Sequence, residues 1–332
     1  MLGRAGLVLV SIVIGLVALE LGLRAANGYL GDWSNLVLDA RSVLARTEGQ
    51  RFQHDELLGH VPRGGLRSNG KEAPPPGERP TLAVGDSYTY GEEVADDETW
   101  PALLQAHTGH PVLNGGVSGY GFDQTVLRAE SLAAKYHPGA IVVSFIADDI
   151  GRTEMSRIWG AEKPYFDIEK NALVLRNVPV PPRPAARTTL SFWQRTLGYS
   201  YLVDFVLRRL DLLHDWFGDH VRVHPEGMGE QIACRLTDRL AELQRLSQAP
   251  VLVVAEYDPV VWDEPKLAPE QRRLTQGLLG CASQRGLATL DSYDRLAAAD
   301  KPRALYKVWH MNKAGNDLIA GMIAKALADH GK

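Results

Sequence analysis

The sequence predicts an α/β fold built on a central parallel sheet. Short apolar runs alternate with amphipathic helical patterns between residues 81 and 327, as in chains that place helices on both faces of a sheet. The strand-like runs are apolar throughout, which is typical of strands covered on both sides. The composition, 45% hydrophobic and 23% charged over 332 residues, allows a sizeable core and excludes disordered, collagen-like and disulfide-framework proteins.

The charge and cysteine content narrow the class further. The formal net charge is −4 with no block of like charge, which argues against a nucleic-acid binder. Cys234 and Cys281 are too few and too far apart for a metal knuckle or a redox CxxC pair. In an oxidising compartment they could form one disulfide, a question that the sequence leaves open.

The first apolar run is a candidate membrane anchor. Residues 6–23 read GLVLVSIVIGLVALELGL, with Glu20 as the one charge, and are long enough to cross a bilayer as a helix. Because Arg4 precedes the run, the positive-inside rule places the N-terminus in the cytoplasm. A cleaved signal peptide and a buried soluble helix are the alternatives, but no A-x-A site directly follows the run. We therefore expect an inner-membrane anchor over residues 1–24, with the body of the protein in the periplasm.

Residues 25–80 are expected to be a spacer or wrapping segment before the main domain. The periodicity there is weak, and the segment ends in GGLRSNGKEAPPPGERP. Three consecutive prolines cannot lie inside a helix or a central strand. The main domain is then expected over residues 81–330, with an insertion at residues 151–229.

The first half of that domain alternates strand and helix. Its helix at 122–136 places apolar side chains on one face, and its last strand is the apolar run AIVVSFI. The predicted elements are strands at 81–84, 111–114 and 140–146 and helices at 100–106 and 122–136.

The alternation resumes after the insertion. Leucine and isoleucine recur at helical spacing from Ile232 to Leu243, and the apolar run VLVVA follows. The predicted elements are helices around 232–243, at 267–285 and at 314–327, and strands at 251–255 and 287–290. In such sheets, ligands bind at the carboxyl ends of the strands.

The insertion breaks this rhythm. PYFDIE and ALVLRN predict a hairpin with a turn at Lys170-Asn171, and a Pro-rich turn and an aromatic-rich helical segment follow. The aromatic stripe could line an acyl or glycan pocket, enter the membrane interface, or pack a helix against the sheet, which is the usual role of such a face. Its residues are Trp193, Tyr201, Phe205 and Trp216.

The segment TLAVGDSYTYGEEV carries the strongest chemical signal. A strand runs into Gly85 and Asp86, so Ser87 stands at the carboxyl end of the first sheet strand. A serine there is exposed, and its own N–H can face a developing oxyanion. A tight turn with a capping serine is the alternative.

Four segments in this order resemble the SGNH (GDSL-type) hydrolase superfamily: GDSYTYGEEV, VLNGGVSGYG, SFIADDI and WHMNKAGNDLIA. The N-terminal anchor and DELLGHVP also look like its membrane-tethered bacterial members. The resemblance implies a flavodoxin-like, three-layer α/β/α sandwich. It also implies ester hydrolysis or acyl transfer through a serine, without a metal or organic cofactor.

The same resemblance assigns three site residues. Ser87 is the nucleophile, Gly119 a backbone oxyanion donor and His310 the base. A glycine suits the donor role because its backbone can approach the substrate closely, although a turn glycine is the alternative. A neutral imidazole can take the serine proton and return it to the leaving alcohol.

Other polar residues are assigned structural roles. Asn312 is expected to cap the last helix. The pair His220 and His224 has HxxxH spacing, but Pro225 argues against a helix, so no metal is expected.

The sequence departs from the family pattern at two positions. Asp148 stands where the family has an oxyanion asparagine. It is either held protonated by burial or turned away to orient His310 or pair with Arg152. Lys307 stands where the family has its acid, so His310 works in a dyad or with an acid from elsewhere. The candidate acids are Asp148, Asp149, Glu256 and Asp258, whereas Asp86 and, as an alternative, Asp149 are expected to be structural.

We therefore predict a periplasm-facing serine hydrolase that removes ester-linked acyl groups, with O-acetyl groups of cell-envelope glycans as the candidate substrate. An O-acyltransferase on the same scaffold and a non-catalytic binding module are the alternatives. The expected partners are an acylated small molecule or glycan and the membrane, and not nucleic acid.

Overall fold

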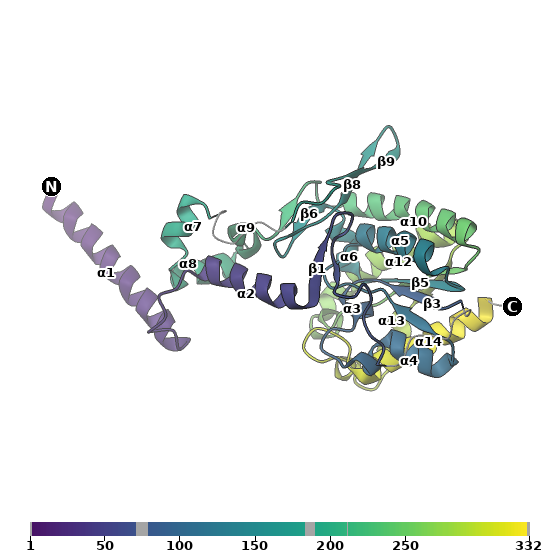
Figure 1. The fold of residues 1–332 in the computed structure, drawn as a ribbon. Coiled ribbons are helices and arrows are strands. Elements are labelled where there is room, and N and C mark those ends of the chain that lie inside the picture. Colours follow the sequence, from purple (N-terminus) through teal and green to yellow (C-terminus); the bar gives the residue numbers. More distant parts are fainter. Residues whose placement is uncertain (1, 71–78, 183–189, 211, 331–332) are drawn as a thin grey trace. The chain divides into compact units, whose positions relative to one another are not determined.

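The computed structural model describes residues 2–70, 79–182, 190–210 and 212–330 (Figure 1). The chain forms two compact units. The N-terminal unit comprises Met1–Arg51, Trp159–Ala161 and Arg183–Val221, and the sheet unit comprises Phe52–Ile158, Glu162–Pro182 and Arg222–Lys332. The sheet unit thus begins at Phe52, within the segment that the sequence predicts as a spacer.

A five-stranded parallel sheet organises the sheet unit and confirms the predicted fold class (Figure 1). Every residue of its central strands is apolar or small, and Val251 to Ala255 are all buried, as expected for strands covered on both faces. In spatial order the strands are β12 (Ala288–Asp291), β11 (Val251–Ala255), β5 (Ala140–Phe145), β3 (Thr81–Val84) and β4 (Val112–Asn114).

Helices cover both faces of this sheet, which confirms the three-layer arrangement (Figure 1). One face carries α5 (Phe122–Tyr136), α10 (Met228–Ser247) and α12 (Ala268–Gln284), and the other carries α4 (Trp100–Thr108) and α14 (Lys313–His330). The Cys234–Cys281 disulfide joins α10 to α12, which answers the question that the sequence left open.

Short elements connect these layers. The helical ones are α3 (Ser87–Tyr90), α6 (Ala147–Arg152), α11 (Val260–Asp263), α13 (Tyr293–Ala297) and the 3-10 turns Asp96–Glu98, Pro265–Leu267 and Pro302–Leu305. The remaining strands are β1 (Phe52–Asp55), β2 (Gly59–Pro62), β6 (Met155–Ile158), β7 (Ala161–Glu162), β8 (Tyr165–Glu169), β9 (Ala172–Arg176) and β10 (Val221–Arg222).

Two hairpins extend the sheet unit. The β1–β2 hairpin buries Phe52, Leu58 and Val61 in the main core, so this part of the expected spacer wraps the domain. The β8–β9 hairpin turns at Lys170 and Asn171, both with positive φ, as predicted.

The N-terminal unit is helical. Its helices are α1 (Leu2–Ala26), α2 (Leu36–Arg51), α7 (Phe192–Leu197), α8 (Tyr201–Arg209) and α9 (Leu213–Phe217). Within α1, Gly6–Ala26 has a mean hydropathy of 2.5 and its most apolar stretch is not buried, so this helix is long and apolar enough to span a membrane.

The aromatic residues of the insertion do not pack as a single stripe. Trp193 and Phe205 are exposed, so the helix-to-sheet packing predicted for them is wrong. Tyr201 and Phe205 instead line a cavity of about 380 Å³ within the N-terminal unit, together with Tyr29, Leu36 and Phe217. These aromatics belong to the unit without the large sheet.

Candidate active site

Ser87 is the first residue of α3, directly after the carboxyl end of β3. Gly85 permits this sharp turn, because a Cβ there would collide with the Thr89 side chain and lie 2.9 Å from the Ser144 carbonyl oxygen. Asp86 caps the helix, since its Oδ1 accepts the Tyr88 N–H at 2.9 Å. The strand, the glycine and the cap together place the serine at the edge of the sheet where ligands bind in this fold.

His310 lies in a tight turn before α14. Tyr306 and Met311 form an antiparallel bridge, and inside it the Lys307 N–H donates to the His310 carbonyl oxygen at 2.9 Å. The imidazole packs against Tyr88, whose hydroxyl donates to the Trp309 carbonyl oxygen at 2.8 Å. As a result, His310 Nε2 lies 3.0 Å from Ser87 Oγ, within hydrogen-bond reach.

Glu93 is the acid that faces His310. Its Oε1 lies 3.8 Å from His310 Nδ1, an ion-pair distance longer than a hydrogen bond. Its Oε2 accepts the backbone N–H groups of Val308, Trp309 and His310 at 3.1, 3.3 and 3.3 Å. Sequence reasoning missed this residue, although it stands in the same GDSYTYGEEV segment as the nucleophile. The sequence signal that could have pointed to Glu93 is Gly91. This glycine ends α3 in a left-handed conformation, which turns the chain back.

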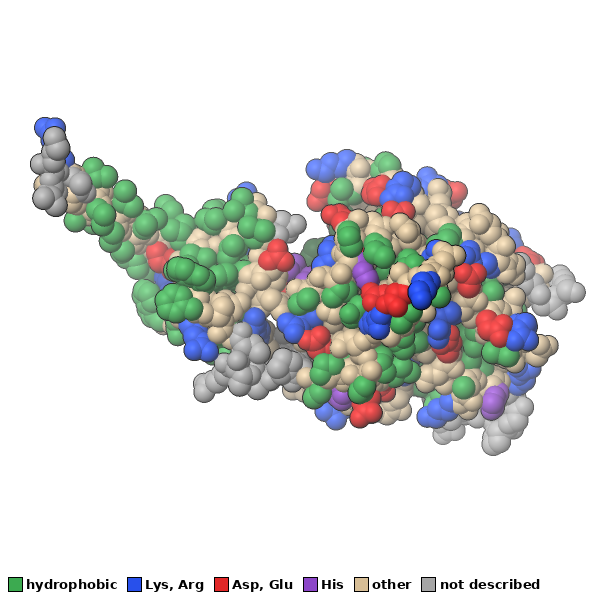
Figure 2. All heavy atoms as spheres, turned by 90° about the horizontal axis from the view of Figure 1, so that it is seen from above, with side chains coloured by type: hydrophobic (Ala, Val, Ile, Leu, Met, Phe, Trp, Pro, Cys, Tyr) green, Lys and Arg blue, Asp and Glu red, His purple; other side chains and the backbone are tan. Residues whose placement is uncertain are grey.

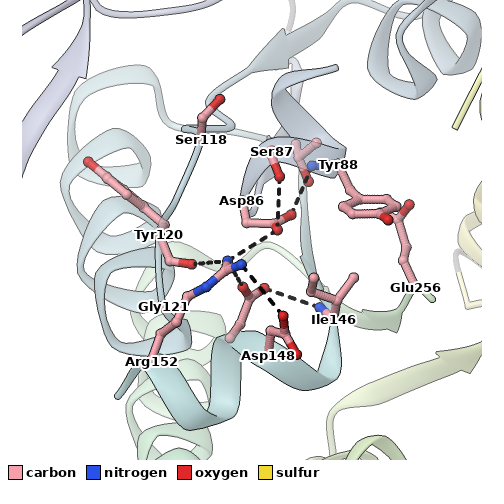
Figure 3. Close-up of polar contacts among 12 residues, drawn as sticks. Asp86, Ser87, Tyr88, Ser118, Tyr120, Gly121, Ile146, Asp148, Arg152 and Glu256 are labelled. Atoms are coloured by element: carbon pink, nitrogen blue, oxygen red, sulfur yellow. Dashed lines mark hydrogen bonds and ion pairs between the residues drawn. The ribbon is translucent and has the colours of Figure 1, made fainter. Parts of the chain in front are cut away.

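The buried Asp86 and the half-buried Arg152 form the base of the site (Figure 3). Asp86 Oδ2 lies 3.3 Å from Ser87 Oγ and 3.5 Å from Arg152 Nη1. With its other oxygen in the helix cap, Asp86 is held as the structural carboxylate that the sequence predicts. The serine has one proton, so it donates to either Asp86 or His310 at any moment.

Asp149 shares the same arginine. Arg152 Nη1 donates to Asp149 Oδ1 at 2.6 Å and to the Tyr120 carbonyl oxygen at 3.1 Å. Burial raises the pKa of Asp149, the charge of Asp86 raises it further, and Arg152 opposes both effects. Asp149 Oδ2 also accepts the Ile146 N–H at 3.1 Å, so this residue caps α6. Of its two predicted alternatives, supporting acid or structural carboxylate, Asp149 therefore takes the structural one.

Asp148 has the opposite environment. Its side chain is 61% exposed, and its Oδ2 lies 4.0 Å from Arg152 Nη2. The alternative in which burial keeps Asp148 protonated therefore does not apply. The geometry matches the other alternative, in which Asp148 turns toward Arg152. Among the described contacts, Asp148 has none with His310.

Gly119 has φ +80°, a conformation that favours glycine, so it is a turn glycine whatever its further role. The neighbouring groups hold its loop: His60 Nε2 lies 3.0 Å from the Ser118 carbonyl oxygen, and the Ser118 hydroxyl donates to Glu92. Within the described part of the chain, the backbone N–H groups of Ser87 and Gly119 donate to no protein acceptor, so both remain available to a substrate oxygen.

The other candidate acids have different partners. Glu256 is fully buried and accepts from Ser144 Oγ at 2.6 Å, and burial raises its pKa to about 8. Asp258 accepts the Val260 N–H at 2.8 Å and a Gln271 amide hydrogen at 3.0 Å. Neither has a contact with His310 among those described. As predicted, Asn312 caps the last helix by accepting the Ala314 N–H at 2.9 Å.

The two histidines of the HxxxH pair, His220 and His224, have different partners. His224 Nε2 lies 3.0 Å from the Phe166 carbonyl oxygen. His220 groups instead with His214 and Asp219, and one possible ligand atom of each lies within 4.8 Å of the others. Within the described residues, the group with the spacing of metal ligands is therefore His214, Asp219 and His220, and not the HxxxH pair.

Residues 83–318 match the model of the GDSL-like lipase/acylhydrolase family. This chain belongs to that family. The sequence-based assignment to the superfamily is therefore confirmed, and the family supports a general acylhydrolase or esterase activity for this GDSL-type protein. No match was found among curated proteins.

Solved structures similar to this GDSL-type chain have low sequence identity. An α/β hydrolase from the metagenome of Lake Arreo, Spain, is 16% identical, with a TM-score of 0.46 over 76% of this chain and 95% of that one. TesA is 15% identical, with a TM-score of 0.41 over 75% and 98%. A lipase/acylhydrolase from Enterococcus faecalis is 12% identical, with a TM-score of 0.42 over 76% and 97%.

Proposed function

We propose that this protein hydrolyses acyl esters through an acyl-enzyme on Ser87. The observation that carries the proposal is the 3.0 Å distance between His310 Nε2 and Ser87 Oγ. At that distance the imidazole takes the hydroxyl proton as the oxygen attacks the ester carbonyl, and it returns the proton to the leaving alcohol. Water then attacks the acyl-enzyme, with His310 again as the base.

Glu93 completes this arrangement as the third member. A carboxylate beside Nδ1 stabilises the imidazolium that forms when His310 takes the proton. The three backbone N–H groups that bind its other oxygen fix Glu93 to the histidine turn itself. The same turn therefore holds both the acid and the base.

The negative charge of the tetrahedral intermediate is assigned to backbone donors. The N–H groups of Ser87 and Gly119 are the proposed oxyanion hole, because a hole needs preorganised donors without a competing acceptor. Asp148 takes no part in donation in this proposal, since an ionised carboxylate has no proton to give.

We place the catalytic unit outside the cytoplasm, with α1 as a single-pass inner-membrane anchor. The apolar span Gly6–Ala26 and the preceding Arg4 support this orientation. The Cys234–Cys281 disulfide also supports it, because disulfides persist in oxidising compartments such as the periplasm. The proposed substrates are then ester-linked acyl groups of the cell envelope, with glycan O-acetyl groups as the candidate.

The direct test is covalent labelling of the full chain with a fluorophosphonate probe. Wild type should label and hydrolyse short-chain aryl esters, whereas Ser87→Ala and His310→Ala should lose both. Ser283→Ala, an exposed serine on α12, is the matched control and should label like wild type. Labelling that is independent of Ser87, together with absent ester turnover, would favour the binding module.

Product analysis then separates hydrolysis from transfer. With an acylated glycan and an added acceptor alcohol, a hydrolase releases the free acid, whereas an acyltransferase gives the new ester. A dominant new ester at modest acceptor concentration would replace the hydrolase by the O-acyltransferase on the same serine.

A further inference from the structure

The N-terminal unit exposes apolar side chains well beyond α1. The described residues outside that helix with large exposed apolar side chains are Tyr29, Leu30, Trp33, Phe192, Trp193, Leu197, Tyr199, Phe205, Val206, Leu210 and Leu212. Phe192 and Trp193 are 69% and 61% exposed. Figure 2 shows hydrophobic side chains over α1 and over much of the neighbouring surface of the same unit. An apolar surface of this extent on a folded protein marks an interaction site.

The carboxyl end of α1 is built into this surface. Glu20 accepts the N–H groups of Tyr201 and Leu202 at 2.9 and 2.8 Å and the Ser200 hydroxyl at 2.8 Å. It therefore caps the start of α8 from another helix. The C-terminal part of the apolar span is thus fixed to the helix that carries Phe205 and Val206.

Four aromatic residues surround the same helix end, and we name them the aromatic collar: Tyr29, Trp33, Tyr199 and Tyr201. The buried Arg24 holds them together, because its guanidinium lies 4.1 Å from the Trp33 ring and 4.7 Å from the Tyr201 ring and donates to the Tyr199 carbonyl oxygen. Tyr29 stacks on Tyr201 at 4.9 Å. Tyrosine and tryptophan around the end of a membrane span are typical of the headgroup region, where their rings bury an apolar body beside a polar tip.

The short helices add an amphipathic surface. On α8, Phe205 and Val206 are exposed, while Arg208 pairs with Asp204 one helical turn earlier. Arg195, Arg208 and Arg209 are exposed cations that suit anionic headgroups. Apolar side chains mixed with arginine are the pattern of helices that lie in a bilayer interface.

We propose that the aromatic collar and helices α7 and α8 lie in the headgroup layer of the membrane that α1 spans. This inference rests on the anchor of the proposed function. Its occupant is the lipid bilayer, because the surface continues directly from the end of the apolar span. The N-terminal unit is then a membrane-embedded platform, and not only a tether.

The test uses spin labels on the full chain in nanodiscs of phosphatidylethanolamine and phosphatidylglycerol. Single cysteines replace Leu30, Phe192 and Val206, and the native disulfide leaves no other free thiol. Collisions with oxygen, which concentrates in lipid, are compared with collisions with a water-soluble nickel complex. Arg208→Cys is the matched control on α8, Lys325→Cys is the aqueous reference, and Leu16→Cys reports on the anchor. Thermal unfolding of each labelled variant, followed by circular dichroism, confirms that it is folded.

We expect a several-fold higher oxygen-to-nickel ratio at 30, 192 and 206 than at 208 and 325. If the label at position 16 is lipid-exposed while the labels at positions 30, 192 and 206 match the one at position 325, the platform proposal is wrong and the anchor proposal stands. If 16 also matches 325, the anchor fails and the platform fails with it. Loss of ester hydrolysis in the unlabelled wild type would affect only the catalytic proposal.

Discussion

Two acidic turns border the serine, and they differ in what holds them. The Glu93 carboxylate is bound by three backbone N–H groups of the histidine turn and faces the imidazole. The Asp148 carboxylate, at the start of α6, is 61% exposed and has a distant contact with Arg152. Sequence position alone pointed to Asp148 and not to Glu93. The difference shows that the backbone donors around a carboxylate, and not its sequence position alone, decide which acid faces the imidazole.

The geometry of the histidine turn explains why the acid that faces His310 can come from a different position in the sequence. Lys307 and His310 pair across a two-residue turn, so their side chains extend from neighbouring positions on one face. An acid at 307 would therefore stand beside the imidazole, as the family pattern has it. Here Lys307 instead donates through Nζ to the Glu93 carbonyl oxygen, and Glu93 supplies the carboxylate from the other side.

The largest expected effect on this comparison comes from Glu93→Gln. The amide still accepts backbone N–H groups, so the turn is kept, but the charge facing His310 is lost. We expect kcat/KM for an aryl ester to fall by about 10³-fold, within the range for general acid–base groups and their supporting acids. Steady-state kinetics on the purified full chain measure this.

A surface substitution provides the control for Glu93→Gln. Glu242→Gln removes an exposed acid on α10 that pairs with Arg245, and it should leave kcat/KM unchanged. Wild-type rates in Glu93→Gln, with Ser87→Ala still inactive, would mean that His310 works as a dyad with Ser87.

The second largest expected effect concerns Glu256. This carboxyl is fully buried and belongs to neither acidic turn. Its pKa is raised from 4.5 to about 8 by burial, so the folded state holds a proton that the unfolded state releases. The contribution of Glu256 to stability is therefore fully present below about pH 4.5 and is lost as the pH rises toward 8. Glu256→Gln should remove this loss and stabilise the fold near neutral pH by up to about 3 kcal/mol, at about 1.4 kcal/mol per pH unit.

Thermal unfolding of wild type and Glu256→Gln across this pH range gives the readout. The two midpoints should converge in acid and separate toward alkaline pH, with the variant higher. Parallel curves at all pH values would show that Glu256 ionises normally in the folded protein.

A third, smaller effect tests whether the acid can be moved. In a Glu93→Gln background, Lys307→Asp places a carboxylate opposite His310, and we expect it to recover about 10-fold of the lost kcat/KM. Lys307→Asn in the same background controls for loss of the lysine. Equal activity of the two double variants would contradict the geometric account of the turn.

The sheet could be predicted from sequence because its signals are local. The apolar run at 251–255 and the glycine-ended run at 81–84 each report on their own burial, and the structure places both within the predicted bounds. Glu93 could not be found in this way, because its partner His310 lies 217 residues away and the contact depends on positive φ at Gly91 and Glu93. The packing prediction for the exposed Trp193 failed for a similar reason, because the pattern of a helical face does not reveal which surface contacts it.

The smallest expected effect is that of Asp148→Asn, which restores the family's residue at this position. If the exposed carboxylate takes no part in donation, kcat/KM should change by less than about 3-fold, as for a surface charge near a site. The shape of the pH profile should also be preserved, because no protonated Asp148 is required. A gain confined to alkaline pH would instead show that the wild-type carboxyl donates a proton to the oxyanion, and the first turn of α6 would then join the Glu93 turn as part of the catalytic machinery.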